Sequence, residues 1–205
     1  MWGVCAAEIG GACSSFCIDV DMANAFFSLL APNECGQYIK YQHHTNAYRT
    51  MISAYYGIPE CDAKVLLLKA LFGYVGVVGG KENLGVLPVL YELAAACSAT
   101  KARLAVTRPE LQQHFVNLGR RDPKASTLTY ILMDREHQVL SDFIHCLGEF
   151  DFQLVCPIFD GAIVTSKGFM NDAGSLQAIA QRMFDMHGIS FVQKQFVNLN
   201  KRRRT

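Results

Sequence analysis

The hydrophobic pattern changes from a helical to a strand period after Gly148, and this change most constrains the fold. Apolar side chains recur at helical spacing over residues 126–147. Residues 152–158 and 162–165 then have the character of two short strands. Between them stands Asp160-Gly161, a pair typical of a tight turn. The sequence therefore predicts a long helix followed by a β-hairpin with a carboxylate at its tip.

A second strand ends on another acidic residue near the start of the chain. Residues 16–20 are a run that is apolar except for Asp19 and predicts a buried strand, and Asp21 follows it directly. Residues 23–30 then show a helical pattern. Because side chains alternate along a strand, Asp19 and Asp21 lie on one face of the sheet. If this strand neighbours the hairpin, Asp21 and Asp160 converge.

The remaining pattern predicts an α+β protein with an antiparallel sheet covered by helices on one face. Helices are predicted at 47–56, 60–72, 87–104 and 172–187, and a last strand at 189–197. The segments between them are a polar loop at 37–46 that contains His43 and His44, a glycine-rich loop at 73–85, and a polar segment at 108–124 that contains two prolines.

Charge and composition bound the function without naming it. The chain has 205 residues, about half of them apolar, with 19 Lys and Arg against 18 Asp and Glu. A nucleic-acid binder is usually more basic than this, so any such role needs positive charge that is local. Residues 201–205 form a basic tail that could supply some of it, although a solvated terminus explains the tail equally simply.

Cysteine usage and hydropathy indicate the compartment. The eight cysteines include no C-x-x-C pair, and several stand inside apolar runs. We interpret them as reduced thiols of an intracellular protein. No uninterrupted apolar stretch reaches membrane-spanning length, so we expect a soluble protein with no membrane partner.

Paired carboxylates at strand ends suggest metal-dependent phosphoryl transfer. Two divalent ions about 3.5–4 Å apart activate an attacking hydroxyl and stabilise the leaving oxygen. Mg²⁺ suits such a site because it accepts carboxylate and phosphate oxygens while keeping water. The alternative is that Asp21 caps the next helix and Asp160 is an ordinary turn residue. Asp19 is either a further metal contact or a neighbour that tunes the site.

Three motifs in the same order resemble those of family A DNA polymerases. The first motif of that family is an Asp after a strand, an amide three residues on, and a closing Leu-Ala pair. Asp21, Asn24 and Leu30-Ala31 match it here. The second is a helix with a Lys followed by an aromatic-Gly pair, matched by Lys64 and Phe72-Gly73. The third is an Asp at a hairpin tip, matched by Asp160.

The resemblance covers residues 16–73 and 126–197, and it implies a single palm-like domain over 1–205 with a helical fingers-like insertion at 47–104. It implies template-directed nucleotidyl transfer by two Mg²⁺ ions, with primed DNA and nucleoside triphosphates as partners and further polymerase domains or subunits outside this chain. The residues that it implicates are Asp21, Asp160 and Asp19 for metal, with Lys64, Phe26, Phe72 and Tyr74 for the nucleotide.

Several positions depart from the pattern of the family. Glu60 replaces an Arg that contacts the triphosphate, and Phe26 replaces the Glu of the steric gate. Phe159 and Gly161 replace the His and Glu that flank the third-motif Asp. An Asp-Gly hairpin tip also occurs in divergent viral and mobile-element polymerases, and at this motif the chain resembles those more than the bacterial enzymes.

Other interpretations of the same residues stay open. Lys64 either binds the triphosphate or faces solvent, and Lys69 competes with it for the triphosphate. Tyr74 either stacks on a base or ends its helix. Arg120-Arg121 and Lys124 are plausible phosphate contacts, and Asp134, Glu136 and His137 either contact primer or template or lie on a solvated helix face. The chain as a whole could instead be a non-catalytic remnant or fragment, or the palm of a primase-polymerase or reverse transcriptase.

Overall fold

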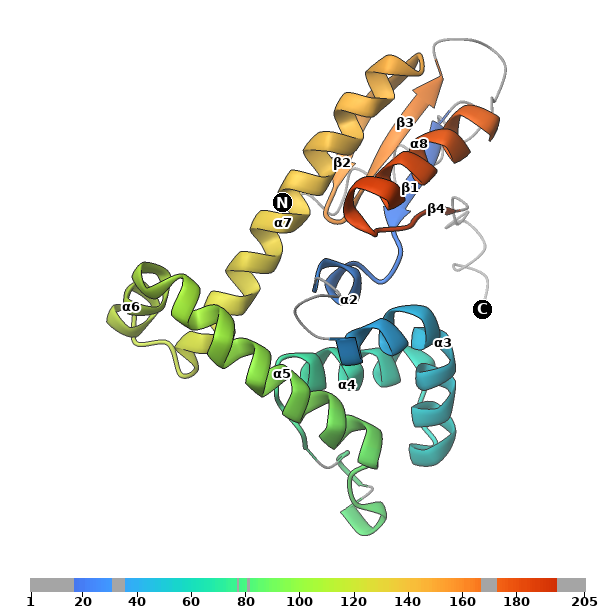
Figure 1. Ribbon diagram of the computed structural model, residues 1–205. Coiled ribbons are helices and arrows are strands. Elements are labelled where there is room, and N and C mark those ends of the chain that lie inside the picture. Colours follow the sequence, from blue (N-terminus) through green and yellow to red (C-terminus); the bar gives the residue numbers. More distant parts are fainter. Residues whose placement is uncertain (1–16, 31–35, 77, 81, 167–172, 195–205) are drawn as a thin grey trace. The chain divides into compact units, whose positions relative to one another are not determined.

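The computed structural model describes residues 17–30, 36–76, 78–80, 82–166 and 173–194 (Figure 1). The chain forms two compact units, one made of residues 1–25 with 135–205 and the other of residues 26–134. In chain order the elements are β1 (Cys17–Met22), α2 (Ala25–Leu29), α3 (Gly36–Tyr56), α4 (Glu60–Leu71), η1 (Glu82–Leu84), α5 (Pro88–Thr107), α6 (Pro109–Asn117), α7 (Pro123–Glu149), β2 (Phe152–Ile158), β3 (Gly161–Ser166), α8 (Ala173–His187) and β4 (Phe191–Lys194).

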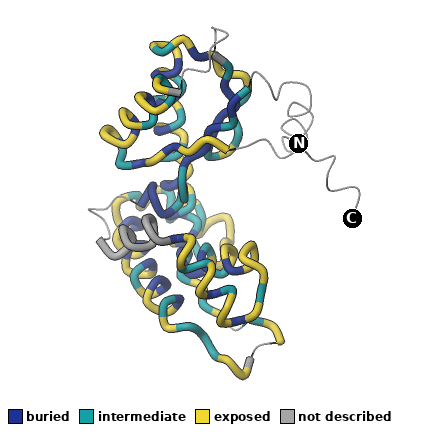
Figure 2. The backbone as a smooth tube through the Cα atoms, turned by 90° about the vertical axis from the view of Figure 1, so that its right-hand side faces the viewer, coloured by how far each residue is buried: buried dark blue, intermediate teal, exposed yellow. Residues whose placement is uncertain are grey.

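The first unit, here called the sheet unit, is built on a four-stranded antiparallel sheet. Its strand order is β2-β3-β1-β4, so the hairpin lies beside β1 and the last strand closes the other edge. The C-terminal part of α7 and all of α8 cover one face of this sheet (Figures 1 and 2). The predicted α+β class and the convergence of β1 with the hairpin are therefore confirmed.

Side-chain alternation in β1 separates an apolar face from an acidic one. Ile18, Val20 and Met22 are buried under the helices, where Phe143 of α7 stacks on Phe191 of β4 with 4.4 Å between ring centroids. Alternation directs the other set of β1 side chains, which includes both aspartates, to the opposite face. The helices thus hold β1 by its apolar face, and the face that carries the two aspartates is not covered by them.

The second unit, here called the helical unit, packs α3, α4, α5 and α6 in sequence. Its core is made of large aliphatic side chains together with Tyr56, which is 1% exposed. The Tyr56 hydroxyl donates to Gly85 O and accepts from Leu87 N, both at 3.0 Å. These two hydrogen bonds satisfy the buried hydroxyl and fasten the end of the glycine-rich loop to the core.

The end of α4 depends on a glycine and a buried lysine. Gly73 follows the helix with φ +79°, a left-handed conformation that glycine adopts without strain. A Cβ at this position would lie 2.9 Å from Lys101 Nζ. That ammonium donates to Phe72 O and to Asp122 Oδ2, both at 3.0 Å. Lys101 therefore ties the end of α4 to the turn that precedes α7.

The sequence-based boundaries are close where the pattern is strong and fail in two polar segments. The predicted polar loop at 37–46 is wrong, because these residues belong to α3. They include no Gly or Pro, and Gln, Lys and His are compatible with a helix once its neighbours form one. The segment at 108–124 contains the unpredicted helix α6 and the start of α7. Both helices begin at a proline, a residue pre-organised for the first helical position.

Other predictions fall partly outside the described residues. The strand predicted at 189–197 is observed as Phe191–Lys194, and the predicted basic tail at 201–205 lies outside the described part. The predicted insertion at 47–104 falls within the helical unit. Among the described helices, none is long and apolar enough to cross a membrane.

The ion pair between Lys101 and Asp122 should make the stability of the fold depend on pH. Burial alone would raise the pKa of the Asp122 carboxyl, but the hydrogen bond from Ala125 N–H and the hydrogen-bonded Lys101 charge outweigh burial, so the pKa is lowered. A lowered carboxyl pKa stabilises the fold above the unfolded-state pKa, and this stability is lost as the pH falls. Asn retains the ability to cap α7 but leaves Lys101, 10% exposed, without its counter-charge.

We therefore expect Asp122→Asn to lower the free energy of unfolding by about 1–3 kcal/mol at pH 7, a range reduced from that of a fully buried pair. The difference from the wild type should shrink between about pH 5 and pH 2, as measured by urea unfolding. The exposed Asp134→Asn variant is the control. Equal stability of wild type and Asp122→Asn at pH 7 would contradict the assignment.

Candidate functional site

The carboxylates predicted from the two strand ends meet across one strand pair. Asp21 of β1 is the direct partner of Gly161, the first residue of β3. Beside this pair, Met22 N donates a hydrogen bond to Asp160 O at 2.8 Å. Asp160 is thus one residue from the cross-strand partner of Asp21. The register places the acidic end of β1 against the acidic tip of the hairpin.

This register requires glycine at position 161. A Cβ there would lie 2.4 Å from Val20 O and 2.5 Å from Asp21 Oδ1. No real side chain tolerates backbone that close, so the strands approach as they do only because the residue after Asp160 has no side chain. The sequence analysis gave Gly161 a role in the turn, and the structure adds this contact with Asp21.

A lysine that the sequence analysis did not single out neutralises Asp21. Lys194 Nζ, from the end of β4, forms an ion pair with Asp21 Oδ2. The Asp21 side chain is 11% exposed and the Lys194 side chain 53%. A buried carboxylate needs a counter-charge or hydrogen bonds, and Lys194 supplies the charge. The strand was predicted, but only its register, in which Lys194 faces Asp19, brings this lysine to the site.

Asp19 lies in the same electrostatic environment. Burial raises the pKa of the Asp19 carboxyl above its usual value, the Lys194 ammonium lowers it, and the Asp160 charge raises it. The net shift is upward. Asp19 therefore responds to both charged groups that border Asp21, which agrees with its predicted place on the same face.

A further carboxylate approaches from α7. The pKa of Glu136 is raised, first by burial and then by the negative charge of Asp160. Asp134 and His137 are exposed, as expected for a solvated face, whereas Glu136 is only partly exposed. The solvated-face prediction is therefore wrong for Glu136. The influence of Asp160 on Glu136 could not be predicted, because the sequence does not reveal which side of α7 faces the hairpin tip.

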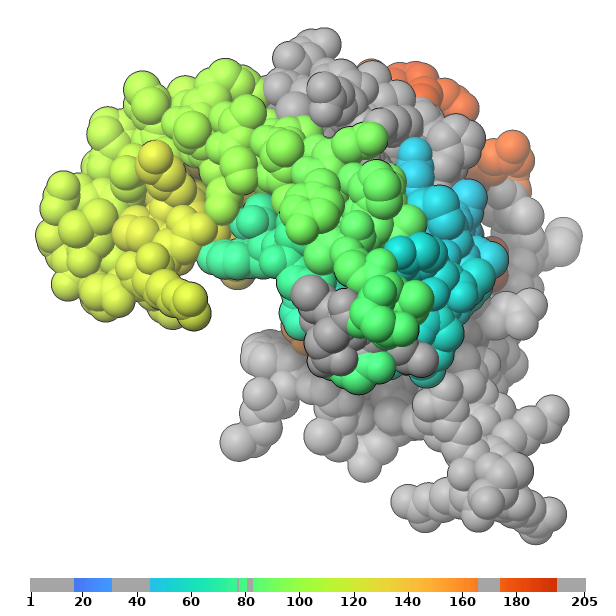
Figure 3. All heavy atoms as spheres, turned by 90° about the horizontal axis from the view of Figure 1, so that it is seen from below, coloured from blue at the N-terminus to red at the C-terminus, as the bar shows by residue number. Residues whose placement is uncertain are grey.

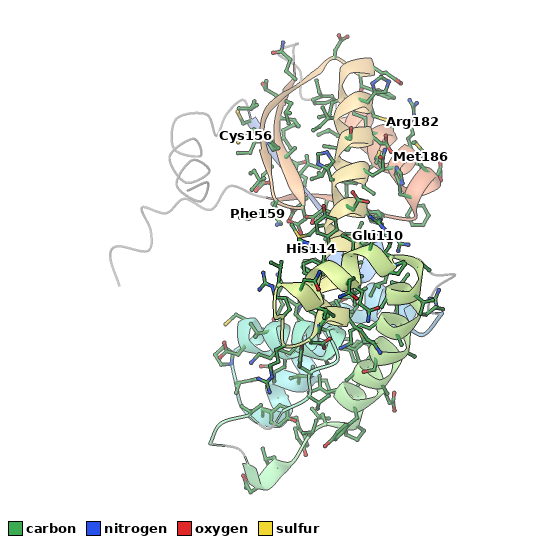
Figure 4. The ribbon with its side chains drawn as sticks, turned by 90° about the vertical axis from the view of Figure 1, so that its left-hand side faces the viewer. Glu110, His114, Cys156, Phe159, Arg182 and Met186 are labelled. Atoms are coloured by element: carbon green, nitrogen blue, oxygen red, sulfur yellow. The ribbon has the colours of Figure 1, made fainter. Side chains whose placement is uncertain are left out.

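The residue before Asp160 is held in a strained conformation. Ile158 pairs with Gly161, so Phe159 and Asp160 alone form the loop, and Phe159 has φ +36°. An aromatic residue rarely adopts a left-handed conformation, which costs on the order of 1–3 kcal/mol. The side chain is 81% exposed and stands at the hairpin tip (Figure 4). The conformation of this turn therefore lowers the stability of the fold while it holds an exposed aromatic ring next to a carboxylate.

The carboxylates that the structure describes at the site are the right type of ligand for a hard divalent cation, but too few of them are close together to form a complete metal site. Asp21 and Asp160 offer carboxylate oxygens, the ligands that Mg²⁺ prefers. Within the described part of the chain, however, no group of three or more His, Cys, Asp and Glu side chains is placed to hold a metal ion. An ion at Asp21 would have to displace the Lys194 ammonium from Oδ2.

The residues predicted to contact a nucleotide all belong to the helical unit. Phe26 and Phe72 pack edge to face, with 5.9 Å between centroids and an interplanar angle of 76°. The Tyr74 hydroxyl donates to Asp122 Oδ2 at 3.1 Å. Lys64 is exposed on α4. The structure therefore brings the two phenylalanines together and anchors Tyr74, while the assignment of all four residues to a nucleotide stays a prediction.

Comparison with known proteins supports the fold. No family model matches the chain, and no curated protein matches it in sequence. A similar solved structure is the POL domain of Pol1 from M. smegmatis in complex with DNA primer-template and dNTP. The TM-score is 0.55 at 8% sequence identity, and the match covers 88% of this chain and 39% of that chain.

At this identity the likeness shows the fold alone. The chain has a mixed fold of the polymerase type, in which the antiparallel sheet covered by helices is palm-like. It spans about two fifths of the matched chain. The narrower resemblance to family A DNA polymerases stays a prediction from the motifs.

The close contact at Gly161 predicts a large effect of a single methyl group. Gly161→Ala should lower the free energy of unfolding by about 1–3 kcal/mol or more, because backbone rather than a flexible side chain opposes the new Cβ. Gly148→Ala is the matched control. Its Cβ would meet nothing within 4 Å, and within α7 the exchange should stabilise by about 0.5–1 kcal/mol.

Opposite signs for the two alanine variants in denaturant unfolding would support the register of β1 and β3. Two variants that both stabilise the protein would contradict it.

Proposed function

We propose that this protein catalyses template-directed nucleotidyl transfer as a DNA polymerase-like palm, with Asp21 and Asp160 as the metal-binding carboxylates. The observation that carries the proposal is the register in which Asp21 faces Gly161 beside Asp160. The motif order found in the sequence gives this pair its chemical meaning. Its partners would be primed DNA and nucleoside triphosphates.

The two carboxylates would act by holding charge where phosphate reacts. Mg²⁺, when bound, would supply the positive charge that lowers the barrier to attack on a triphosphate. Asp21 suits this role because it is buried and fixed by strands on both sides. Asp160 suits it because a tight turn holds it at the exposed end of the hairpin. Asp19 and Glu136 would set the electrostatic environment of the pair.

The helical unit would supply the contacts to the incoming nucleotide. Lys64 would neutralise triphosphate charge, as the resemblance implies. The edge-to-face pair of Phe26 and Phe72 offers a rigid aromatic surface, and an aromatic at position 26 could exclude a ribose 2′-hydroxyl. Tyr74 offers a second ring for base stacking.

A second candidate is a non-catalytic palm that binds nucleic acid. The ion pair between Lys194 and Asp21 favours it, because a fixed lysine can replace a metal ion as the counter-charge. Glu60 and Gly161 favour it also, since each replaces a residue that the family uses for chemistry. Primase-polymerase and reverse-transcriptase palms are further alternatives, and Asp19-x-Asp21 matches the aspartate spacing of the former.

Nucleotide incorporation distinguishes these candidates. With primed DNA, nucleoside triphosphates and Mg²⁺, the wild type should extend the primer, whereas Asp21→Asn and Asp160→Asn should each lose at least about a hundredfold in rate, as expected for removal of transition-state charge stabilisation. Asp62→Asn, an exposed carboxylate on α4, is the control. Equal activity in wild type and Asp160→Asn would refute the site, and an inactive wild type that still binds DNA would favour the non-catalytic palm.

The role of Lys194 can be measured without turnover. If its ammonium competes with a metal ion for Asp21, Lys194→Gln should tighten Mg²⁺ binding by about three- to tenfold, the range expected for releasing a partly exposed ion pair. Isothermal titration with MgCl₂ measures this directly, and Asp21→Asn in the same background should abolish the gain. Unchanged or weaker Mg²⁺ binding in Lys194→Gln would show that the lysine does not compete.

A further inference from the structure

The helical unit contains an open cavity that the predicted nucleotide contacts only partly explain. It has a volume of about 470 Å³ and lies between the C-terminal half of α4 and the start of α7. In Figure 3 the surface is hollowed between the turquoise segment of α4 and the yellow segment at the start of α7. The size is in the range of pockets that hold small organic ligands.

Three cations line the wall of this cavity. Lys69 comes from α4, and Arg120 and Arg121 come from the turn between α6 and α7. None of the three forms an ion pair with any residue that the structure describes. The one carboxylate on the wall, Asp122, is already bound by Lys101. The cavity therefore presents an excess of positive charge to an incoming ligand.

The rest of the wall is aromatic and apolar. Leu68 and Val65 line it from α4, and Phe72 and Tyr74 line it from the turn that follows the helix. Tyr74 is 49% exposed, yet its hydroxyl is held by Asp122, and Lys101 Nζ lies 5.3 Å from the centroid of its ring. An exposed ring fixed at its polar end loses little entropy when a flat ligand stacks on it.

We propose that this cavity binds one nucleotide, with the phosphate at Lys69, Arg120 and Arg121 and the base against Tyr74 and Phe72. Stacking combined with cationic side chains is the usual basis of sequence-independent nucleotide binding. The ligand is either a free nucleotide or one nucleotide of a single strand, since both present the same chemistry. The inference rests on the proposed function for its biological meaning, but the binding itself requires neither Asp21 nor Asp160.

This assignment selects between the two lysines of α4. Lys69 lies four residues after Val65 and three residues before Phe72, the spacings that place side chains on one helix face. Lys64 is not among the residues that line the cavity. The motif spacing of the family favoured Lys64 as the phosphate contact. The cavity favours Lys69, because Lys69 lines it and Lys64 does not.

Binding of a labelled oligonucleotide tests the proposal. Fluorescein-labelled dT10 is titrated with the full chain in EDTA, and binding is followed by anisotropy. Lys69→Ala and Arg121→Ala should each weaken binding by about five- to tenfold, as expected for one charge-assisted contact. Tyr74→Leu should weaken it by at least about fivefold through lost stacking, and Tyr74→Phe, which keeps the ring but loses the hydrogen bond to Asp122, should weaken it less. Circular dichroism confirms that each variant is folded.

Two controls separate the cavity from general electrostatics. Arg108→Gln removes one positive charge from the same unit, where Arg108 is already paired with Glu110, and should leave binding unchanged. Lys64→Ala should weaken binding less than Lys69→Ala. An equal loss in Arg108→Gln and Lys69→Ala, or a loss in Lys64→Ala alone, would overturn the proposal.

Competition identifies the source of the ligand. Unlabelled dT10 that displaces the probe better than dATP identifies a strand nucleotide, and the reverse identifies a free nucleotide. Pyrophosphate that displaces the probe as well as either, with no effect of Tyr74→Leu, would overturn the role of the base. Binding of dT10 is measured in EDTA and without turnover, so failure of nucleotide incorporation and failure of this cavity are separate results.

Discussion

The approach of β1 to the hairpin at Asp21 and Gly161 is the contact on which the candidate site depends. Because side chains alternate along a strand, a shift of one residue in this pairing would turn Asp21 toward the helices and expose Val20. The missing side chain at position 161 and the apolar packing of the opposite face hold the register together. Burial on one face of β1 thereby determines what chemistry is possible on the other.

The sequence was sufficient for the parts of the fold with a strong hydrophobic period. The hairpin, the long helix before it and the strand before Asp21 were all predicted, because each combines a clear period with a turn or cap residue. Residues 37–46 and α6 were not, since both segments are rich in polar residues, for which helix propensity alone is a weak guide. In such segments tertiary context decides the outcome.

The candidate site divides in the same way. Asp21 and Asp160 could be found because strand ends and hairpin tips are local features. Lys194 and Glu136 could not, because each reaches the aspartates through a register or a helix rotation that only the assembled fold determines. In the helical unit, the spacing of a known motif selected Lys64, while the cavity is lined by Lys69. Spacing along one helix shows which residues can share a face. It does not show that the face with Lys69 meets Arg120 and Arg121, because these two residues come from a different segment of the chain.

The ion pair between Lys194 and Asp21 also has a consequence for how the protein is made. A cluster of acidic residues that relied on metal ions for neutralisation would fold poorly wherever those ions are scarce, since unpaired buried charge opposes folding. Here the last strand carries its own cation to the centre of the sheet. The counter-charge of Asp21 is therefore part of the fold itself, and burial of this carboxylate in the sheet does not depend on a bound cation.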